Sequence, residues 1–344
     1  MNEIVIHTCT EEDQPRWDEF VNTHLECTSY HRWQWKPIFE AVFGWPGIYL
    51  LAEVNGTIRG ILPLIRQKCM LHCYLSSMPH LKGGGIVAEN SDVENALYTK
   101  AIEVARMIDA TYLELRHLVP HNLPLERRQD KVGAILPIEP NEEARLQRLD
   151  KKTRNLVRKS LTYGMTAEFG RANMLHDFYH VYRQNMHDLG SPAYSQLFFA
   201  EILNRLPETS HICIIRSNGK EVAGAFLLGF RDTLEVGWAS SYRKALNLKP
   251  NMFLYWNILN FAAASGYRYL DFGRSTRDSG TYEFKLQWGA LPADLHWGYW
   301  HNHATRQPEK KSEGMQLASV IWRRLPVTFT NIVGPRLIRH IPGI

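Results

Sequence analysis

The sequence predicts an α/β chain of two tandem domains, each a mixed and mostly antiparallel sheet flanked by helices. Two Asn-Gly pairs support this prediction, because each stands between apolar runs as the tight turn of a β-hairpin would. They lie at residues 55–56 and 218–219, about 160 residues apart. In both halves the hairpin is followed by a helical pattern and then by a further apolar strand, at residues 111–115 and 267–272. We therefore infer an internal duplication.

Composition narrows the class of protein. A chain of 344 residues, 44% of them hydrophobic, is long enough for two domains with separate cores. The net charge of +5 suits an anionic partner but is too small to indicate nucleic-acid binding by itself. Five scattered cysteines fit reduced thiols rather than a disulfide framework. Because the sequence has neither a cationic-then-apolar leader nor a long apolar run, we expect a cytoplasmic protein that does not span a membrane.

Residues 1–141 are expected to form the first domain. Thr10, followed by three acidic residues, marks the start of a helix. The aromatic residues of 31–45 are more typical of packing than of a cofactor site. The glycines of residues 83–85 could approach a phosphate, although the lysine and hydroxyl pair of a phosphate-binding loop is missing. A group of cysteine and histidine residues at 69–73 lacks a fourth metal ligand, so we expect no metal site there.

Residues 270–289 carry the densest set of chemistry-bearing side chains. A buried strand ends at Gly273, whose conformational freedom lets the chain turn and expose Arg274 and Ser275. Lys285 then stands between aromatic residues at what we expect to be the edge of a strand. Two interpretations stay open. The lysine lies along apolar surface with its ammonium group in water, or it holds a fixed positive charge against negative charge that develops on a reacting carbonyl or phosphate.

A strongly cationic helix is expected at residues 142–159. Its apolar positions, among them Leu146, Leu149 and Leu156, fall on one side. Such a run is usually a solvated face, but cations gathered on one accessible flank also suit phosphates. The cations are Arg145, Arg148, Lys151, Lys152, Arg154, Arg158 and Lys159.

Three segments together resemble the Fem-like (FemAB) branch of the GNAT acyltransferase superfamily. They are DFGRSTRDSGTYEFKLQWGA at residues 271–290, LDKKTRNLVRKSLTYG at 149–164 and DLGSPAYSQLFF at 188–199. The segment IWRRLPVTFTNIVGPRLIRHIPG is also similar to the tails of Fem-like proteins associated with PEP-CTERM and exosortase systems. The resemblance implies two GNAT-like domains, with catalysis in residues 142–305 and a tail at residues 306–344. The first copy lacks a Phe-Lys pair after its strand and is expected to support rather than catalyse.

The reaction that the resemblance implies is N-acyl or aminoacyl transfer to an amine of a cell-envelope precursor, either an exopolysaccharide or a peptidoglycan component. The amine would attack directly within a ternary complex. No cofactor would be bound permanently, and acyl-CoA or aminoacyl-tRNA would serve as co-substrate. The acceptor would be an anionic nucleotide-sugar or a lipid-linked precursor. The mixture of apolar residues and arginines in the tail itself leaves two interpretations open, a segment docked on the body of the protein or a basic amphipathic segment in peripheral contact with the inner membrane. Residues 243–251 lack the glycines of the usual acyl-CoA turn, which counts against ordinary acetyl-CoA use.

The resemblance also implies roles for particular residues. We expect Lys285 to stabilise the oxyanion, Phe284 to shape the pocket and Asp271 to be a candidate base, although substrate-assisted proton transfer is equally open. Arg274 and Ser275 are expected to hold the anionic substrate. The remaining expected substrate contacts are Lys152, Arg154, Arg158, Asp188, Tyr194 and Tyr282.

A non-enzymatic interpretation stays open beside this one. A degenerate pair of GNAT-like domains could act as a binding module in envelope polymer assembly. The presence of Arg274, Lys285 and the cationic helix together speaks against it, because a scaffold needs no cation at that position.

Overall fold

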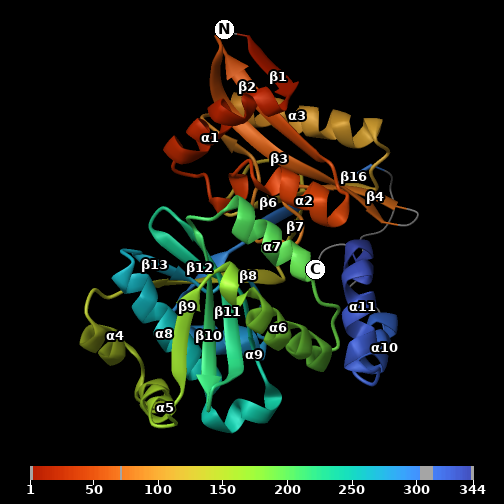
Figure 1. Cartoon of the computed structure of the whole chain (residues 1–344). Helices are drawn as coiled ribbons and strands as arrows, with labels where there is room; N and C mark the ends of the chain where they lie inside the picture. The colour runs from red at the N-terminus through yellow and green to blue at the C-terminus, as the bar shows by residue number, and fades with distance from the viewer. Residues whose placement is uncertain (1–2, 70–71, 303–312, 342–344) are drawn as a thin grey trace. The chain divides into compact units, whose positions relative to one another are not determined.

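The computed structural model describes residues 3–69, 72–302 and 313–341 (Figure 1). The chain forms two compact units, each discontinuous in sequence. Unit 1 comprises the described residues of Met1–Asp130, Asp294–Glu309 and Arg339–Ile344. Unit 2 comprises those of Lys131–Ala293 and Lys310–Ile338. None of the helices formed by the described residues is both long enough and apolar enough to cross a bilayer.

Unit 1 is built on a sheet with the strand order β1-β2-β3-β4-β6-β16-β7, in which β5 also pairs with β3. The pair β4–β6 is parallel, and the other pairs are antiparallel. The strands are β1 Ile4–Thr8, β2 Gly47–Val54, β3 Thr57–Cys69, β4 His72–Ser76, β5 Val87–Ala88, β6 Tyr112–His117, β7 Glu126–Arg128 and β16 His296–His301. The helices are α1 Gln14–Thr23, α2 Trp35–Phe43 and α3 Ser91–Met107, with short 3₁₀ helices η1 Glu11–Asp13 and η2 Ser29–His31.

Unit 2 repeats this plan with the strand order β14-β8-β13-β12-β11-β10-β9, and β15 also pairs with β8. Its parallel pair is β12–β13. The strands are β8 Lys131–Pro137, β9 Thr166–Gly170, β10 Ser210–Ser217, β11 Lys220–Phe230, β12 Thr233–Ser241, β13 Tyr269–Asp271, β14 Ser275–Thr276 and β15 Leu291–Asp294. The helices are α4 Glu142–Arg148, α5 Lys151–Leu161, α6 Leu175–Leu189, α7 Gln196–Arg205, α8 Pro250–Ala264, α9 Gly280–Leu286, α10 Glu313–Trp322 and α11 Val327–Leu337, with 3₁₀ helices η3 Ala172–Met174 and η4 Arg243–Leu248.

The two hairpins confirm the predicted duplication. Asn55 and Gly56 have φ values of 52° and 74°, and Asn218 and Gly219 have values of 51° and 74°. Positive φ at both central residues is the geometry that favours Asn-Gly between antiparallel strands. In each unit the hairpin joins the second and third strands of the same topology, and one parallel pair follows. The predicted fold class, two tandem mixed sheets flanked by helices, is confirmed.

The compact units differ from the predicted domains 1–141, 142–305 and 306–344 in two strands. β8 precedes residue 142, yet it pairs with β13 and belongs to unit 2. β16 lies within 142–305, yet it pairs with β6 and belongs to unit 1. Each exchanged strand covers an edge that would otherwise expose unpaired backbone groups. Of the predicted tail, residues 306–312 and 342–344 lie outside the described residues, and α10 and α11 belong to unit 2.

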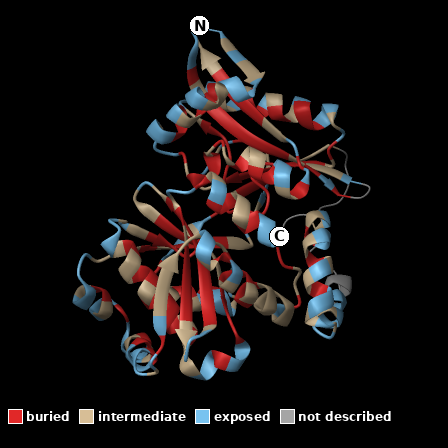
Figure 2. Cartoon of the chain, viewed as in Figure 1, coloured by how far each residue is buried: buried red, intermediate tan, exposed pale blue. Residues whose placement is uncertain are grey.

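Each unit has its own apolar core between its sheet and helices, as the buried residues in Figure 2 show. The aromatic residues predicted to pack in 31–45 do so. Trp33 lies 5.3 Å from Tyr49 and 5.9 Å from Trp17, measured between ring centroids, and all three are buried. Burial of such rings is the main stabilising term available to a chain of this composition.

A buried histidine makes unit 1 sensitive to acid. His31 Nδ1 accepts a hydrogen bond from the Thr28 N–H at 3.0 Å, and Nε2–H donates to the Gly85 carbonyl at 3.0 Å. Burial lowers the pKa of His31 to about 4 from its usual 6.5. Stability from the neutral ring is therefore present above pH 6.5 and is lost as the pH falls toward 4.

We expect unfolding free energy to fall by about 2 kcal/mol between pH 7 and pH 5 from this histidine alone, since only the unfolded chain gains the proton there. His31→Gln should be less stable at pH 7 but should lose about that much less on acidification. Urea denaturation at the two pH values, followed by tryptophan fluorescence, checks both expectations. Equal acid losses in the two proteins would show that the pKa of His31 in the folded protein is not lowered.

Candidate active site

The two parallel strands of unit 2 separate at their carboxyl ends. β12 and β13 pair at three positions only, the last being Glu235 with Asp271. β12 continues to Ser241, whereas β13 ends at Asp271. Among the described residues, no strand pairs with this edge of β12 beyond Glu235. Backbone N–H and C=O groups along such an edge need partners, so the gap is a place where a ligand can bond to the main chain.

A β-bulge lies in β12 immediately after the strands separate. Leu227 of β11 pairs with Val236 and Phe226 pairs with Trp238, so Gly237 is the extra residue. A bulge redirects a strand and leaves one residue outside the ladder. The sequence analysis did not identify this bulge. The available signal was a glycine inside a strand pattern.

The turn after β13 is held by an acidic and a basic side chain. The Asp271 carboxylate accepts a hydrogen bond from the Gly273 N–H at 2.8 Å. Lys285 Nζ donates to the carbonyls of Gly273 and Arg274 at 3.0 and 2.9 Å. Asp271 and Lys285 are both buried. The structure therefore brings Asp271, Arg274 and Lys285 together at the end of β13, beside the open edge of β12.

Lys285 lies in a helix, and its expected place at the edge of a strand was wrong. Residues Gly280–Leu286 form α9, and the Ser279 side chain caps its N-terminus by accepting from the Tyr282 N–H. Tyr282 and Lys285, three residues apart, are both buried on one face. The interpretation that places the ammonium group in water is wrong, because this group is buried and donates to two main-chain carbonyls. The interpretation of a fixed positive charge that faces a reacting group stays a prediction.

The serine after the turn is also placed differently from the prediction. Ser275 was expected to be exposed, but it is buried in β14, where it pairs with Val132 of β8. Within the described residues its Oγ atom has no hydrogen-bond partner. A buried hydroxyl without a partner is unusual and remains available to a ligand or water.

Phe284 faces the core of unit 2. Its ring lies 5.1 Å from Tyr255 and 6.3 Å from Trp288. Tyr255 in turn stacks on Phe272 at 5.3 Å. These contacts hold α9 against α8 and the end of β13, so Phe284 fixes the helix that carries Lys285.

Gly273→Ala should destabilise the site. Gly273 has φ +68°, and a Cβ atom would lie 3.2 Å from the Val236 carbonyl oxygen. We expect a loss of about 1–2 kcal/mol, the cost of a left-handed conformation for a residue with a side chain. Gly280→Ala is the matched control, because a Cβ there meets nothing within 4 Å and φ is not positive. Thermal unfolding of both variants checks this, and equal melting temperatures would contradict it.

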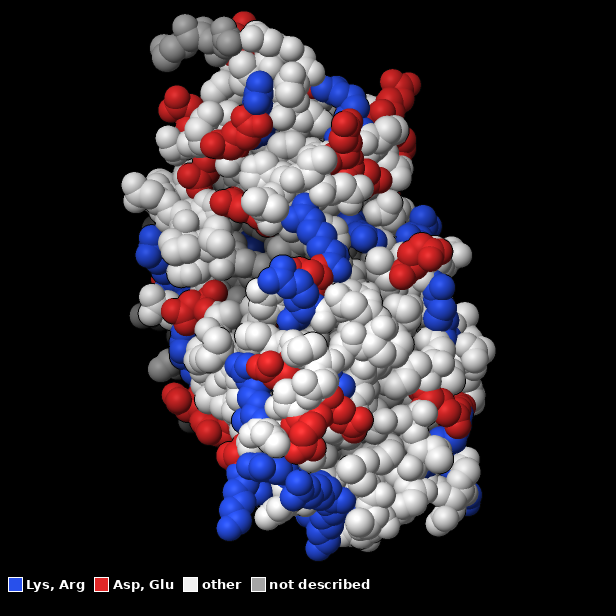
Figure 3. All heavy atoms as spheres, turned by 90° about the vertical axis from the view of Figure 1, so that its left-hand side faces the viewer, with Lys and Arg blue, Asp and Glu red and all other residues white. Residues whose placement is uncertain are grey.

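The predicted cationic helix is two helices. α4 ends at Arg148 and α5 begins at Lys151, because the Asp150 side chain accepts from the Thr153 N–H at 2.9 Å and starts a new helix. α5 packs against α8. Lys152 and Arg158 are exposed, and Arg154 is half-buried and donates to the Leu149 carbonyl at 3.3 Å. Figure 3 shows the lysine and arginine group at this end of unit 2.

Of the two residues predicted to contact the acceptor, Tyr194 lies against β12 and Asp188 contacts η4. Tyr194 is buried, with its ring 6.2 Å from Trp238, which follows the bulge. Asp188 makes two hydrogen bonds. Its carboxylate accepts from Gln184 at 2.8 Å, and its main-chain carbonyl accepts from Arg243 at 2.9 Å. Tyr194 thus contacts Trp238, next to the bulge, whereas Asp188 holds Arg243, the first residue of η4.

The matching gap in unit 1 is filled by the chain itself. β4 and β6 also pair at three positions, ending with Ser76 and Glu114. Beyond them, the Arg116 N–H donates to Ser77 Oγ at 2.8 Å and its carbonyl accepts from the Gly85 N–H at 3.0 Å. A Cβ at Gly85 would lie 3.0 Å from the His117 Cα. The glycine run therefore serves close packing here.

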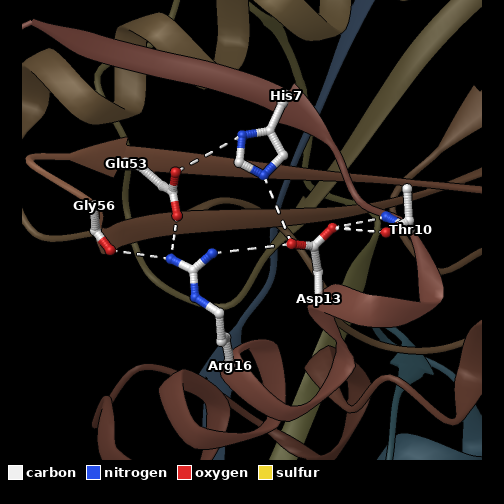
Figure 4. Close-up of polar contacts among 6 residues, drawn as sticks. All are labelled: His7, Thr10, Asp13, Arg16, Glu53 and Gly56. Carbon is white, nitrogen blue, oxygen red and sulfur yellow. Dashed lines mark hydrogen bonds and ion pairs between the residues drawn. The ribbon is translucent and has the colours of Figure 1, made fainter.

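A second cluster of charges in unit 1 joins β1, α1 and the first hairpin (Figure 4). Arg16 pairs with Glu53 and donates to the Gly56 carbonyl at 3.1 Å. The Asp13 carboxylate accepts from the Thr10 N–H at 2.8 Å and lies 3.9 Å from His7. The Arg16 side chain is 44% exposed, so these ion pairs contribute little to stability and fix the edge strand in place.

Comparisons with known proteins agree with this architecture. The crystal structure of FemX superimposes with a TM-score of 0.69 at 15% identity, covering 86% of this chain and 97% of that chain. A tandem GNAT protein from the clavulanic acid biosynthesis pathway gives 0.55 at 12%, covering 89% and 100%. L-PGS from Bacillus licheniformis gives 0.52 at 11%, covering 78% and 86%. A search of curated protein sequences found no match.

The family model that matches the sequence covers the part of the chain where the candidate site lies. It spans residues 144–286, which include the separated strands, the bulge and Lys285. The structural likenesses, at such low identities, concern the fold of the whole chain. Both units thus have the fold of tandem GNAT proteins, and residues 144–286 match the acetyltransferase (GNAT) domain.

Proposed function

We propose that unit 2 is an acyltransferase that moves an activated acyl group onto an amine of a cell-envelope precursor. The observation that supports this most is the open edge of β12 at the Gly237 bulge, beside the turn held by Lys285. Amide N–H groups along that edge can donate to the acyl carbonyl oxygen. As the amine attacks, this oxygen gains negative charge, and fixed donors stabilise it without reorganising.

The proposed roles follow the placement of the side chains. Lys285 contributes positive charge at the end of β13, and Phe284 holds the helix that carries it. Asp271 is the candidate proton acceptor, with the substrate's own leaving group as the alternative. Arg274, Ser275 and Tyr282 would contact the substrate from the β13 side, where the buried Ser275 hydroxyl has no partner within the part of the chain that the structure describes. Tyr194 and Asp188 belong to the acceptor side of β12.

Acyl-CoA is the proposed donor, with aminoacyl-tRNA as the alternative to be tested. η4 and the residue before α8 follow β12 and carry Arg243, Lys244 and Lys249, which can pair with a diphosphate. Lys249 has φ +57° where the usual acyl-CoA turn has glycine. Because every acyl-CoA carries the same diphosphate, this departure does not distinguish one acyl chain from another. The match of residues 144–286 to the acetyltransferase (GNAT) domain supports an acyl-CoA donor.

The acceptor is proposed to be an anionic nucleotide-sugar or a lipid-linked precursor of exopolysaccharide or peptidoglycan. The exposed cations of α5, among them Lys152 and Arg158, suit its phosphates, and Arg154 borders them. The sequence segments shared with Fem-like proteins, including those associated with PEP-CTERM systems, support an envelope substrate. The protein would act on it from the cytoplasm.

Thermal stabilisation by a panel of acyl-CoAs of rising chain length, beside charged and uncharged tRNA, tests the proposal. A ligand at about 100 times its dissociation constant adds roughly 2.7 kcal/mol, which is easily detected. Stabilisation that depends on acyl chain length supports N-acyl transfer. Stabilisation by charged tRNA alone would replace the donor by aminoacyl-tRNA.

One observation favours a second candidate, a binding module without catalysis. Lys285 donates two hydrogen bonds to main-chain carbonyls, as a purely structural lysine would. Incubation with a stabilising donor and amine-bearing envelope precursors, followed by mass spectrometry, separates the two. Binding without any transferred acyl group would favour the module.

A further inference from the structure

The last two helices of unit 2 leave a large apolar face exposed. In α10, Leu317 is 62% and Ile321 is 52% exposed. In α11, Phe329 is 49% and Ile332 is 65% exposed. Figure 2 shows exposed residues along both helices. With Val320 and Leu337, also exposed, these residues define the α10–α11 face.

This face is organised rather than left over from folding. Leu317, Val320 and Ile321 are spaced by three and four residues, so they share one side of α10. On α11 the opposite side is buried at Thr330 and Gly334. α11 packs against α6, and a Cβ at Gly334 would lie 3.3 Å from the nitrogen of Ala193, in the segment that follows α6. On α11, Thr330 and Gly334 therefore face inward, whereas Phe329 and Ile332 face outward.

The charge on this segment has one sign. No acidic residue follows Glu313 in the sequence, whereas Arg323, Arg324, Arg336 and Arg339 do. Arg324 and Arg336 are exposed; Arg336 lies four residues after Ile332 on α11, and Arg324 lies in the turn that follows α10. A second copy of this face would meet it with like charge, and an acidic bilayer surface would meet it with opposite charge. Large apolar side chains mixed with arginines fit the boundary between headgroups and acyl chains.

We propose that the α10–α11 face docks on an anionic phospholipid bilayer and holds the protein at the membrane surface. The apolar side chains enter the acyl boundary and the arginines pair with lipid phosphates. This inference stands apart from the proposed acyl transfer, although docking would bring unit 2 to lipid-linked acceptors. If the protein bound vesicles but no acyl donor stabilised it, the proposed acyl transfer would fail and the docking proposal would stand.

Co-sedimentation with vesicles of equal parts phosphatidylglycerol and phosphatidylcholine, compared with pure phosphatidylcholine, tests the docking. We expect binding to the anionic vesicles that weakens with salt. The double variant Ile321→Asp with Ile332→Asp should bind at least about tenfold more weakly, since two apolar anchors are lost. Leu25→Asp with Leu291→Asp is the matched control, because both leucines are exposed elsewhere and should be replaceable without effect.

Variants that remove positive charges test which surface of the protein contacts the vesicle. Arg324→Gln with Arg336→Gln should weaken binding by about fivefold for each arginine removed. Lys151→Gln with Lys159→Gln on α5 should leave it unchanged. Loss of binding in the α5 pair alone would place the contact on α5 and overturn the proposal. Absence of binding to anionic vesicles, or a dimer in solution that the Ile321 and Ile332 changes dissociate, would overturn it as well.

Discussion

Arg116→Met is expected to lower the free energy of unfolding of unit 1 by about 3–5 kcal/mol, the cost of breaking a buried ion pair from one side. Arg116 is fully buried, with Nη2 3.0 Å from the Glu114 carboxylate and Nη1 donating to the Leu81 carbonyl at 2.6 Å. Without it, the buried Glu114 keeps Tyr299 as a hydrogen-bond donor at 2.5 Å but has no countercharge. Urea denaturation at neutral pH measures the loss.

The same pair makes the loss depend on pH. Burial raises the pKa of Glu114, but the charge of Arg116 and the hydrogen bonds to the carboxylate outweigh it and hold the pKa below its usual value. The contribution of the pair is therefore present above the ordinary carboxyl pKa and is lost as the pH falls through the folded value. In Arg116→Met the carboxyl group is protonated more readily, so the difference between the two proteins should shrink on acidification.

Adding Glu114→Gln to Arg116→Met should recover part of the stability, because no buried charge is then left uncompensated. If Arg116→Met alone lowered the free energy of unfolding by less than about 1 kcal/mol, water would reach Glu114 and the ion pair would behave as an exposed one.

Local chemistry made the repeated architecture predictable. The two-residue turns of both hairpins require positive φ, which few residue types other than asparagine and glycine accept. Both turns could therefore be predicted from the amino-acid sequence. The turn at Gly273, with φ 68°, was predicted for the same reason, and the strand predicted at residues 267–272 from its apolar pattern forms at Tyr269–Asp271. The pairing of β8 with β13 and of β16 with β6 was not predicted. Each pair joins strands that are distant in sequence, and the residue pattern of a strand does not identify its partner.

The placement of Lys285 shows where the pattern was ambiguous. Seven residues, Gly280–Leu286, with two aromatics and a lysine fit either a short strand or two turns of helix. The Ser279 cap favours the helix. In this helix Lys285 points back toward the turn after β13, which its hydrogen bonds stabilise. The family resemblance singled out the lysine, whose catalytic role stays a prediction, and only the structure shows its two carbonyl partners. The bulge at Gly237 depends on pairing with β11 and has no unambiguous local signature.

Lys285→Met should lower acyl transfer by roughly 3 kcal/mol in the transition state, comparable to losing one oxyanion donor. Measured with the donor that stabilises the protein, this is a decrease of more than about a hundredfold in kcat. The variant also leaves the Gly273 and Arg274 carbonyls without the ammonium donor. Each unsatisfied group costs about 1–3 kcal/mol of stability, so the assay must be run well below the melting temperature of the variant.

Two further substitutions separate charge from positioning. Lys285→Gln keeps N–H donors for the two carbonyls but removes the charge, so it should restore stability more than turnover if the ammonium acts on the reacting oxygen. Recovery of both would make Lys285 a positioning residue whose task is to hold the turn after β13. Lys131→Met is the matched control, since this half-buried lysine donates to the Thr276 hydroxyl at 2.8 Å rather than to the carbonyls of the turn and should tolerate the change. Normal turnover in a folded Lys285→Met protein would remove the lysine from the mechanism and leave the β12 edge as the sole source of oxyanion donors.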